Sequence, residues 1–456
     1  MPEQVRGRTS APPPQRSAAR LPVISASATT FRAAGRTAAL RAFTARFRRT
    51  LDRPLTAYYL ILGASLLILV LGLVMVFSAS QITALSQGLP VLFYFLKQLM
   101  AVVLGLGLML VAARLPVALH RALAYPLLLG SIFLMILVTI PGIGVEVGGN
   151  RNWINVGLFQ IQPSEFGKLA LVLWGADLLA RKQRMRMLDQ WKHLLVPLVP
   201  GAVFLLMLIM AGGDMGTAMI LVAVLFGLLW MAGAPVRLFA GAAGIAVVMS
   251  TALIVLAPHR LARINCVGVT HTGPDEPCWQ AVHGLYALAS GGLFGSGLGA
   301  GVEKWGQLPA SHTDFIFAVT GEELGLAGTL SVLGLFAALG YAGIRVAGRT
   351  KDPFVRYAAG GATTWIMAQA VINIGAVLGL LPIAGVPLPL FSYGGSALLP
   401  TLFAIGMLLC FARSEPGARA ALAARGSTSR IRATLARVLP RRTTARPATG
   451  QPRRER

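Results

Sequence analysis

The sequence predicts an all-α polytopic membrane protein with ten transmembrane helices, both termini in the cytoplasm and one long external loop that carries short amphipathic helices. Three observations predict this fold. Of the 456 residues, 55% are hydrophobic and only 12% are charged, which is about half the charged share of a soluble domain. Apolar runs of membrane-spanning length recur along the chain. The basic residues gather in two tails and in alternate connections.

The charged residues are concentrated at the two ends of the chain. Residues 1–54 contain 11 Arg and two acidic residues, and residues 411–456 contain 12 Arg and two acidic residues, so the ends hold 23 of the 41 basic residues. The 356 residues between them keep 18 basic and 12 acidic side chains, too few to cover a surface that faces water. This distribution excludes a soluble enzyme.

Ten apolar runs are each long enough to cross a hydrocarbon core of about 30 Å. They lie near 57–79, 91–112, 117–140, 163–180, 194–211, 214–232, 236–257, 313–344, 357–380 and 391–411. The eighth run is longer than the core requires, which predicts a tilted helix or one that begins outside the lipid. The first run is itself long enough to span, so we expect no cleavable signal peptide.

The basic residues fix the orientation, because cytoplasmic loops of membrane proteins are enriched in Lys and Arg. Along the chain, basic connections alternate with connections that carry almost no charge. Residues 181–192 and 345–356 are basic like the tails, whereas 80–90 and 381–390 carry no charge. We therefore expect both termini in the cytoplasm.

Three domains follow from this topology: a basic tail over 1–54, a ten-helix membrane domain over 55–412 and a second basic tail over 413–456. The tails are poor in aromatic and β-branched residues, so we expect them to be disordered. Their arginines favour attraction to anionic membrane lipids over nucleic-acid binding.

Residues 258–312 are the one long external loop of this topology. The loop contains apolar stretches among its glycines, at 285–288 and 293–294, so it is predicted to fold back on the membrane surface as short amphipathic helices. Cys266 and Cys278 lie in it with eleven residues between them. A disulfide is favoured there by the oxidising side of the membrane, the alternative being two free thiols.

The same loop carries two adjacent carboxylates between prolines, Asp275 and Glu276. Acidic pairs in external loops are most often solvated charge. A carboxylate at the boundary of membrane and water is also suited to act as a general base on a substrate hydroxyl. Both interpretations stay open at this point.

Ionisable residues at membrane depth indicate functional or structural networks, because an isolated charge in lipid is costly. Glu165 and Lys168 are three residues apart at the start of a predicted helix, so they share a face and are placed to pair. Pro163 and Ser164 suit that helix start. Arg151 precedes it, in a polar segment.

A second polar cluster enters the eighth run. His312 and Asp314 are followed by Glu322 and Glu323, and Glu322 lies about two helical turns beyond Asp314. The acids predict either ion pairing inside the helix bundle or a role toward substrate.

A third polar cluster surrounds Ser392 and Ser396 at the start of the last run. Small polar residues there allow close helix packing, or line a pocket for a sugar or a phosphate. The chain contains no phosphate-binding glycine loop, no metal-ligand spacing and no nucleophile motif.

These motifs resemble the bacterial shape, elongation, division and sporulation (SEDS) proteins, and they occur in that family's order over roughly residues 55–412. The matching segments are Asn150-Arg151-Asn152-Trp153-Ile154, Gln162-Pro163-Ser164-Glu165, Gly295-Ser296-Gly297-Leu298-Gly299, His312-Thr313-Asp314-Phe315-Ile316-Phe317, Gly321-Glu322-Glu323-Leu324-Gly325 and Ser392-Tyr393-Gly394-Gly395-Ser396. The segment 373–390 is more similar to the division members than to the elongation members. The composition, rich in Arg and Ala, is typical of a high-GC actinobacterium.

The resemblance implies a peptidoglycan glycosyltransferase that polymerises lipid II into glycan strands during septal cell-wall synthesis and releases undecaprenyl pyrophosphate. It implies a multi-pass protein of the inner (plasma) membrane at the division septum. The implied partners are lipid II, a class B penicillin-binding transpeptidase, other proteins of the division complex and membrane lipids, without nucleic acid.

The family places its catalytic Asp in the long external loop, directly before a proline. Here the order is Asp275-Glu276-Pro277, so the resemblance implies Asp275 as the catalytic base, with Glu276 as the alternative. Lys304 matches a family lysine. Arg260 and Arg263 stand at the start of the loop.

The residues predicted to bind substrate are therefore Lys304, Arg260, Arg263, Arg151, His312, Asp314, Ser392 and Ser396. Glu165, Lys168, Glu322 and Glu323 are predicted to form a structural polar network. No metal site is predicted. A divalent cation, Mg or Mn, remains open as a cofactor, although no closed ligand set is visible.

Two other functions are compatible with the sequence. A transporter (flippase) of lipid-linked precursors would use the intramembrane acids as a path but would leave the loop carboxylates without a role. A non-catalytic division scaffold would depend mainly on the basic tails.

Overall fold

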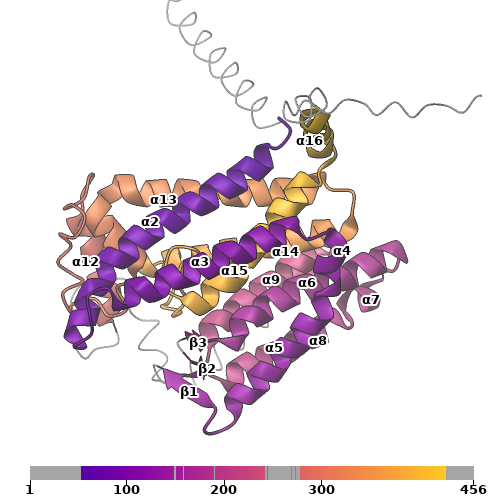
Figure 1. Ribbon diagram of the computed structural model, residues 1–456. Helices are drawn as coiled ribbons and strands as arrows, with labels where there is room; N and C mark the ends of the chain where they lie inside the picture. The colour runs from indigo at the N-terminus through magenta and orange to yellow at the C-terminus, as the bar shows by residue number, and fades with distance from the viewer. Residues whose placement is uncertain are drawn as a thin grey trace, which may run out of the picture. The chain divides into compact units, whose positions relative to one another are not determined.

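The computed structural model describes residues 53–147, 150–157, 159–188, 190–241, 244, 269, 273 and 278–427. Met1–Arg53 and Pro54–Arg456 are separate units, and all the elements below belong to the second unit. Most of its described residues lie in long helices (Figure 1).

The helices are α2 (Thr56–Ser86), α3 (Phe93–Arg114), α4 (Val117–Ala122), α5 (Ala124–Thr139), α6 (Pro163–Arg184), α7 (Trp191–Leu195), α8 (Leu198–Ala211), α9 (Met215–Met231), α12 (Trp279–Ser290), α13 (Ile316–Arg349), α14 (Pro353–Val377), α15 (Gly395–Arg413) and α16 (Pro416–Ser427). Within the described ranges, six helical segments are long and apolar enough to cross a membrane. The protein is therefore a multi-pass membrane protein.

Nine of the ten predicted spans coincide with helices, and most of the seventh, 236–257, lies outside the described residues. Helices α6 and α14 reach spanning length but are not among the six most apolar segments. Buried charges on α6 and buried amides on α14 account for their lower hydropathy. The count of ten stays a prediction.

Helix α14 lies at the centre of the packing, in contact with α6, α9 and α13, while α2 packs on α13 and α3 on α15. Trp365 and Tyr357 of α14 are almost fully buried. Small residues let the outer helices approach closely. A Cβ placed on Gly406 of α15 would lie only 2.3 Å from the Met109 carbonyl of α3.

One part of the fold differs from the all-α prediction. A three-stranded antiparallel sheet, in the order β1-β2-β3, connects α5 to α6. Its strands are β1 (Gly144–Val147), β2 (Asn150–Val156) and β3 (Phe159–Ile161). The prediction of an all-helical chain was wrong here, because Val and Ile recur in this short segment and β-branched residues favour strands.

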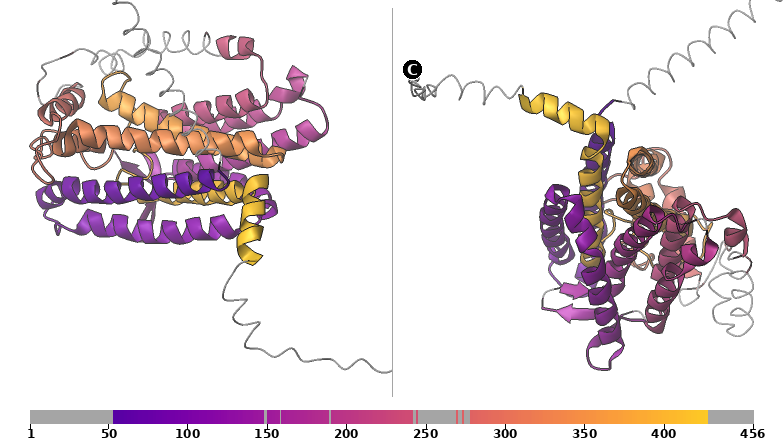
Figure 2. Two further views of the ribbon diagram at one scale, coloured as in Figure 1. Left: turned by 90° about the horizontal axis from the view of Figure 1, so that it is seen from above. Right: turned by 90° about the vertical axis from the view of Figure 1, so that its right-hand side faces the viewer.

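The C-terminal tail differs as well. Helix α16 begins three residues after α15 ends and runs across the direction of α15 (Figure 2). The expectation of disorder was wrong for 416–427, since Ala and Arg, both strong helix formers, dominate the segment. The rest of both tails, 1–52 and 428–456, lies outside the described residues.

Helix α13 is interrupted at Gly325, whose φ of 66° and ψ of −162° are not helical. The backbone of the preceding loop occupies the interruption. Ser296 and Gly297 donate their amide hydrogens to the Glu322 and Glu323 carbonyls at 2.9 and 3.1 Å. On the other side, the amides of Leu326 and Ala327 donate to the Gly292 and Leu293 carbonyls at 2.9 and 3.2 Å. These four bonds replace helical hydrogen bonds that the break removes.

Candidate functional site

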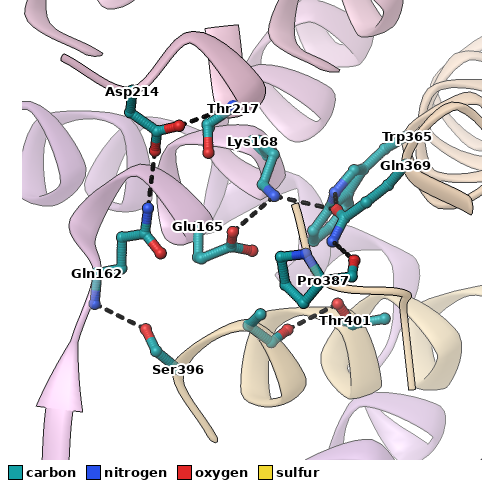
Figure 3. Close-up of polar contacts among 11 residues, drawn as sticks. Gln162, Glu165, Lys168, Asp214, Thr217, Trp365, Gln369, Pro387, Ser396 and Thr401 are labelled. Carbon is teal, nitrogen blue, oxygen red and sulfur yellow. Dashed lines mark hydrogen bonds and ion pairs between the residues drawn. The ribbon is translucent and has the colours of Figure 1, made fainter. Parts of the chain in front are cut away.

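A buried ion pair on α6 begins the first polar network (Figure 3). Lys168 is fully buried, and its Nζ donates to Glu165 Oε1 at 2.8 Å and to Gln369 Oε1 on α14 at 3.0 Å. The Trp365 indole donates to the same Gln369 oxygen. Glu165 lies in the first turn of α6, where a negative charge is favoured by the helix dipole. The predicted pair is thus part of a bridge from α6 to α14.

Asp214 forms the second half of this network. It caps α9 by accepting the Thr217 amide at 2.9 Å, and its other oxygen accepts the Gln162 side-chain amide at 2.7 Å. The Gln162 backbone amide donates to Ser396 Oγ at 2.7 Å. Asp214 was not among the predicted site residues. Its signal was available, because Asp directly before an apolar helix is a preferred cap.

Two buried polar atoms beside this network lack a hydrogen-bond partner, Glu165 Oε2 and Ser164 Oγ. Ser164 lines a cavity of about 20 Å³ together with Asn152 and Thr139. A cavity of this size accommodates a single water molecule. Most polar atoms of the first network are therefore bonded to one another, and the small cavity beside Ser164 is of the size of a water molecule.

The second network joins the external loop to α2 and α13. Lys304 Nζ lies 2.5 Å from Glu323 Oε1 and donates to Ser78 Oγ at 2.9 Å. Ser78 in turn donates to Glu323 at 2.7 Å. All three residues are buried. The carboxylate of Glu322 accepts the amides of residues 302 and 303, which fixes the loop on both sides of Lys304.

His283 and Glu303 extend this second network to α12. The His283 Nδ1 and Glu303 Oε2 atoms are 2.6 Å apart, and the ring centroids of His283 and Trp279 are 3.8 Å apart with the rings tilted by 41°. Sequence reasoning missed this pair, because twenty residues separate its members and no helical spacing relates them. The pair holds the second turn of α12, a helix that begins four residues after Asp275.

His312 and Asp314 lie just before α13. The His312 ring is between Tyr94 and Tyr393, with centroids at 5.2 and 5.5 Å, and burial lowers the pKa of His312 to about 4. Burial raises the pKa of Asp314 to about 6, and the negative charge of Asp214 adds to this shift. The Asp314 backbone carbonyl accepts the Asn373 amide at 2.7 Å.

The serines of the third predicted cluster have structural contacts. Ser392 Oγ accepts the Leu388 amide at 2.8 Å, and Gln98 of α3 contacts both Ser392 and Gly394 through their backbones. Ser396 accepts from Gln162, as described above. Both serines therefore fix the turn that leads into α15. Arg151, in contrast, is exposed on β2, where it is the cross-strand partner of Glu146.

Several predicted site residues lie outside the described residues, namely Asp275, Glu276, Arg260, Arg263 and Cys266. Cys278 is in a disulfide, and Cys410 is free. Over the described ranges, no group of three or more His, Cys, Asp and Glu side chains is placed to hold a metal. Both carboxylate oxygens of Asp214 and of Glu323 already have protein partners, whereas Glu165 has a partner on one oxygen.

Long apolar helices that enclose buried ion pairs define a multi-pass membrane protein with a charged interior. A family model described as cell cycle protein, the FtsW/RodA/SpoVE model, matches residues 58–416. The chain belongs to this family, which confirms the resemblance to the SEDS proteins.

The relatives and solved structures agree with this assignment. The probable peptidoglycan glycosyltransferase FtsW of Mycobacterium tuberculosis is 41% identical over 395 residues, 87% of this chain and 75% of the relative. The stage V sporulation protein E of Bacillus subtilis is 37% identical over 350 residues, 76% of this chain and 95% of the relative. The mycobacterial match supports the predicted actinobacterial origin.

Two solved structures share the fold. The rod shape determining protein RodA of Thermus thermophilus is 28% identical, with a TM-score of 0.57 over 80% of this chain and 98% of that one. A chain from a structure described as "Structural coordination of polymerization and crosslinking by a peptidoglycan synthase complex" is 26% identical, with a TM-score of 0.63 over 80% of this chain and 99% of that one.

Proposed function

We propose that this chain is a peptidoglycan glycosyltransferase that polymerises lipid II into glycan strands during septal cell-wall synthesis. The observation that carries the proposal is the 41% identity, over 87% of the chain, to a relative named as a probable peptidoglycan glycosyltransferase. Family membership over residues 58–416 supports it. The enzyme acts on the outer leaflet, where the external loop lies.

The topology of the proposed enzyme is the one that the charges predict. Ten helices span the membrane, the two basic tails over 1–54 and 413–456 lie in the cytoplasm, and residues 258–312 face outward. The positive-inside rule supports this orientation. Arg345 and Arg349 near the end of α13 lie on the cytoplasmic side, and Glu322 and Glu323 lie on the outer side.

The catalytic base of the proposed reaction is Asp275, with Glu276 as the alternative. The carboxylate removes the proton of the acceptor sugar 4-hydroxyl, and the oxygen forms a bond to the anomeric carbon of the donor. The bond from that carbon to the pyrophosphate oxygen breaks, undecaprenyl pyrophosphate leaves, and the configuration inverts. A general base in this position typically contributes a factor of about 10² to 10⁴ in rate.

The leaving pyrophosphate requires a cation, because negative charge develops on it in the transition state. Lys304 has a family match, but it is 4% exposed and bound to Glu323 and Ser78. We therefore assign Lys304 a positioning role that holds the loop, and α12 through Glu303, against α13. Arg260, Arg263 and the exposed Arg151 remain as the residues that contact the pyrophosphate.

The proposed partner is a class B penicillin-binding transpeptidase at the division septum, within the larger division complex. Support comes from the structural neighbour that belongs to a peptidoglycan synthase complex. The basic tails contact anionic lipids of the inner leaflet. We propose no nucleic-acid partner.

The transporter alternative is less well supported by the described contacts. A path for a lipid-linked sugar would use the buried acids, yet Glu323 is paired with Lys304, and Glu165 is paired with Lys168. The Lys304–Glu323 pair joins the external loop to α13, and Lys168, paired with Glu165 within α6, also donates to Gln369 of α14. Buried charges are costly inside a membrane. A non-catalytic scaffold does not require them, so the scaffold alternative does not explain the buried ion pairs.

The test is lipid II polymerisation by the purified protein with its presumed transpeptidase, whose own activity is blocked by a β-lactam. Asp275→Asn is expected to abolish glycan chains, while Glu276→Gln and the exposed control Glu146→Gln retain them. Loss with Glu276→Gln alone moves the base by one residue. Normal synthesis by both loop variants would exclude catalysis by these carboxylates. If the wild type makes no glycan, the transporter or scaffold takes precedence.

A further inference from the structure

The loop before α13 exposes an unusual set of large apolar side chains. We call residues 293–305 the apolar segment. Its exposed side chains are Leu293 (65%), Phe294 (84%), Leu298 (59%), Val302 (69%) and Trp305 (66%). Contiguous exposed apolar surface on a protein marks a contact with another phase or molecule.

The attachment point of the apolar segment sets its depth along α13. Gly292, Leu293, Ser296 and Gly297 are hydrogen-bonded through their backbones to both sides of the Gly325 interruption. From Arg345 at the cytoplasmic side, the 20 residues 325–344 lead back to this point. At a rise of about 1.5 Å per residue they cover about 30 Å, the thickness of the hydrocarbon core. The segment is thus attached where the core ends on the outer side.

The surface beside this attachment belongs to a membrane-spanning helix. Leu326 and Leu330 of α13 are 48% and 56% exposed, and the Ala327 amide bonds to Leu293. Apolar side chains exposed on a spanning helix are placed to face lipid wherever no partner helix covers them. The apolar segment therefore continues a lipid-facing surface at the level where Trp and other aromatic residues concentrate in membrane proteins.

We propose that the apolar segment is an interfacial anchor whose Phe294, Leu298 and Trp305 side chains insert into the outer leaflet of the bilayer. The occupant of this surface is phospholipid, at the boundary between headgroups and acyl chains. The ion pair of Lys304 and Glu323 holds the neighbouring backbone just outside the core. This inference rests on the proposed topology but is independent of the proposed enzymatic activity.

The test measures the depth of a nitroxide spin label at residue 294 in the full chain, reconstituted in phosphatidylcholine and phosphatidylglycerol nanodiscs. Phe294→Cys is labelled in a Cys410→Ser background, because Cys278 is already in a disulfide. Labels at Leu330→Cys and Glu146→Cys serve as lipid and water references, since both residues are exposed. Leu298→Cys is a second site within the segment.

For each label we compare its collision rate with oxygen to its collision rate with a water-soluble nickel chelate. We expect this ratio to be higher at 294 and 298 than at 146 and to approach the value at 330. Values at both sites equal to that of residue 146 would overturn the proposal. The proposal would also be overturned if the labels at 294 and 298 were protected from the nickel chelate only when the transpeptidase is added. The surface would then bind a protein partner. The substituted side chains are exposed, so the fold is expected to survive.

Discussion

Lys304 and Glu323 form an ion pair at 2.5 Å between the external loop and α13, and Ser78 of α2 contacts both charged groups. Each charge is buried, so neither is compensated by water. Glu303, the neighbour of Lys304, carries the connection to His283 on α12. A continuous set of polar contacts therefore runs from α2 to the helix that follows the proposed catalytic carboxylate.

Removing one partner of this pair is expected to be costly. Lys304→Met leaves a buried, unpaired carboxylate at Glu323, so we expect a loss of about 3–5 kcal/mol in the free energy of unfolding. The double variant Lys304→Met/Glu323→Gln should recover much of it, because no buried charge remains. Thermal unfolding in detergent measures both. Equal losses in the single and double variants would contradict the assigned pairing.

The link between α12 and the loop is testable by a double-mutant cycle. His283→Ala, Glu303→Ala and the double variant are expected to show a coupling on the order of 1 kcal/mol in unfolding free energy. Glycan synthesis should fall in each variant through a lower kcat, since the pair positions α12 rather than contacting lipid II. Strictly additive losses of stability would show that the two side chains do not interact.

Asp214 combines a helix cap with a bond to Gln162. Asp214→Ala is expected to cost about 1 kcal/mol for the lost cap, with a further loss from the unpaired Gln162 amide. Asp214→Asn keeps an oxygen acceptor for the Thr217 amide and should retain more stability. Guanidinium or thermal unfolding distinguishes the variants, and an Ala variant as stable as Asn would speak against the cap.

The close approach of α3 and α15 at Gly406 predicts that a larger side chain at this position destabilises the protein. Gly406→Ala places a Cβ 2.3 Å from the Met109 carbonyl, and the required shift is expected to cost about 1–3 kcal/mol. Gly107→Ala on α3 is the matched control, because a Cβ there meets nothing within 4 Å. The control should be neutral or slightly stabilising through helix propensity. Similar melting temperatures for the two variants would refute the close contact.

The raised pKa of Asp314 predicts that the stability of the folded protein depends on pH. Its pKa in the folded protein is raised to about 6, above its ordinary value, so the folded state binds this proton more tightly than the unfolded state. The contribution of Asp314 to stability is therefore lost as pH rises from about 4 to about 6. Asp314→Asn should gain stability over the wild type above pH 6, and the gap should close toward pH 4. Melting curves across this range test it, and a constant gap would contradict the shift.

The sequence predicted the helical spans well, because long apolar runs and alternating basic loops report membrane crossing directly. It also predicted that Glu165 and Lys168 share a helix face, since their spacing of three residues is local. It did not predict Gln369 as the second partner of Lys168, or His283 as the partner of Glu303. Such contacts depend on how distant helices pack, and no local spacing encodes them.

The small sheet over 144–161 was missed for a related reason. In a chain dominated by apolar helices, short strands rich in Val and Ile resemble the ends of spans. The contacts of Lys304 could not be predicted from the sequence either, because its partners lie on α2 and α13. Its family match predicts a substrate cation, which stays a prediction, and the structure adds that Lys304 is buried and paired with Glu323.

The interruption of α13 at Gly325 has a mechanical consequence. The part of α13 that carries Glu322 and Glu323 is joined to the external loop by backbone hydrogen bonds, and the non-helical residue Gly325 separates it from the rest of the helix. The loop and this outer part of α13 are therefore held together by backbone hydrogen bonds on both sides of Gly325. A displacement of the loop would move Glu322 and Glu323 with it, and so would disturb the contact of Glu323 with Ser78 of α2.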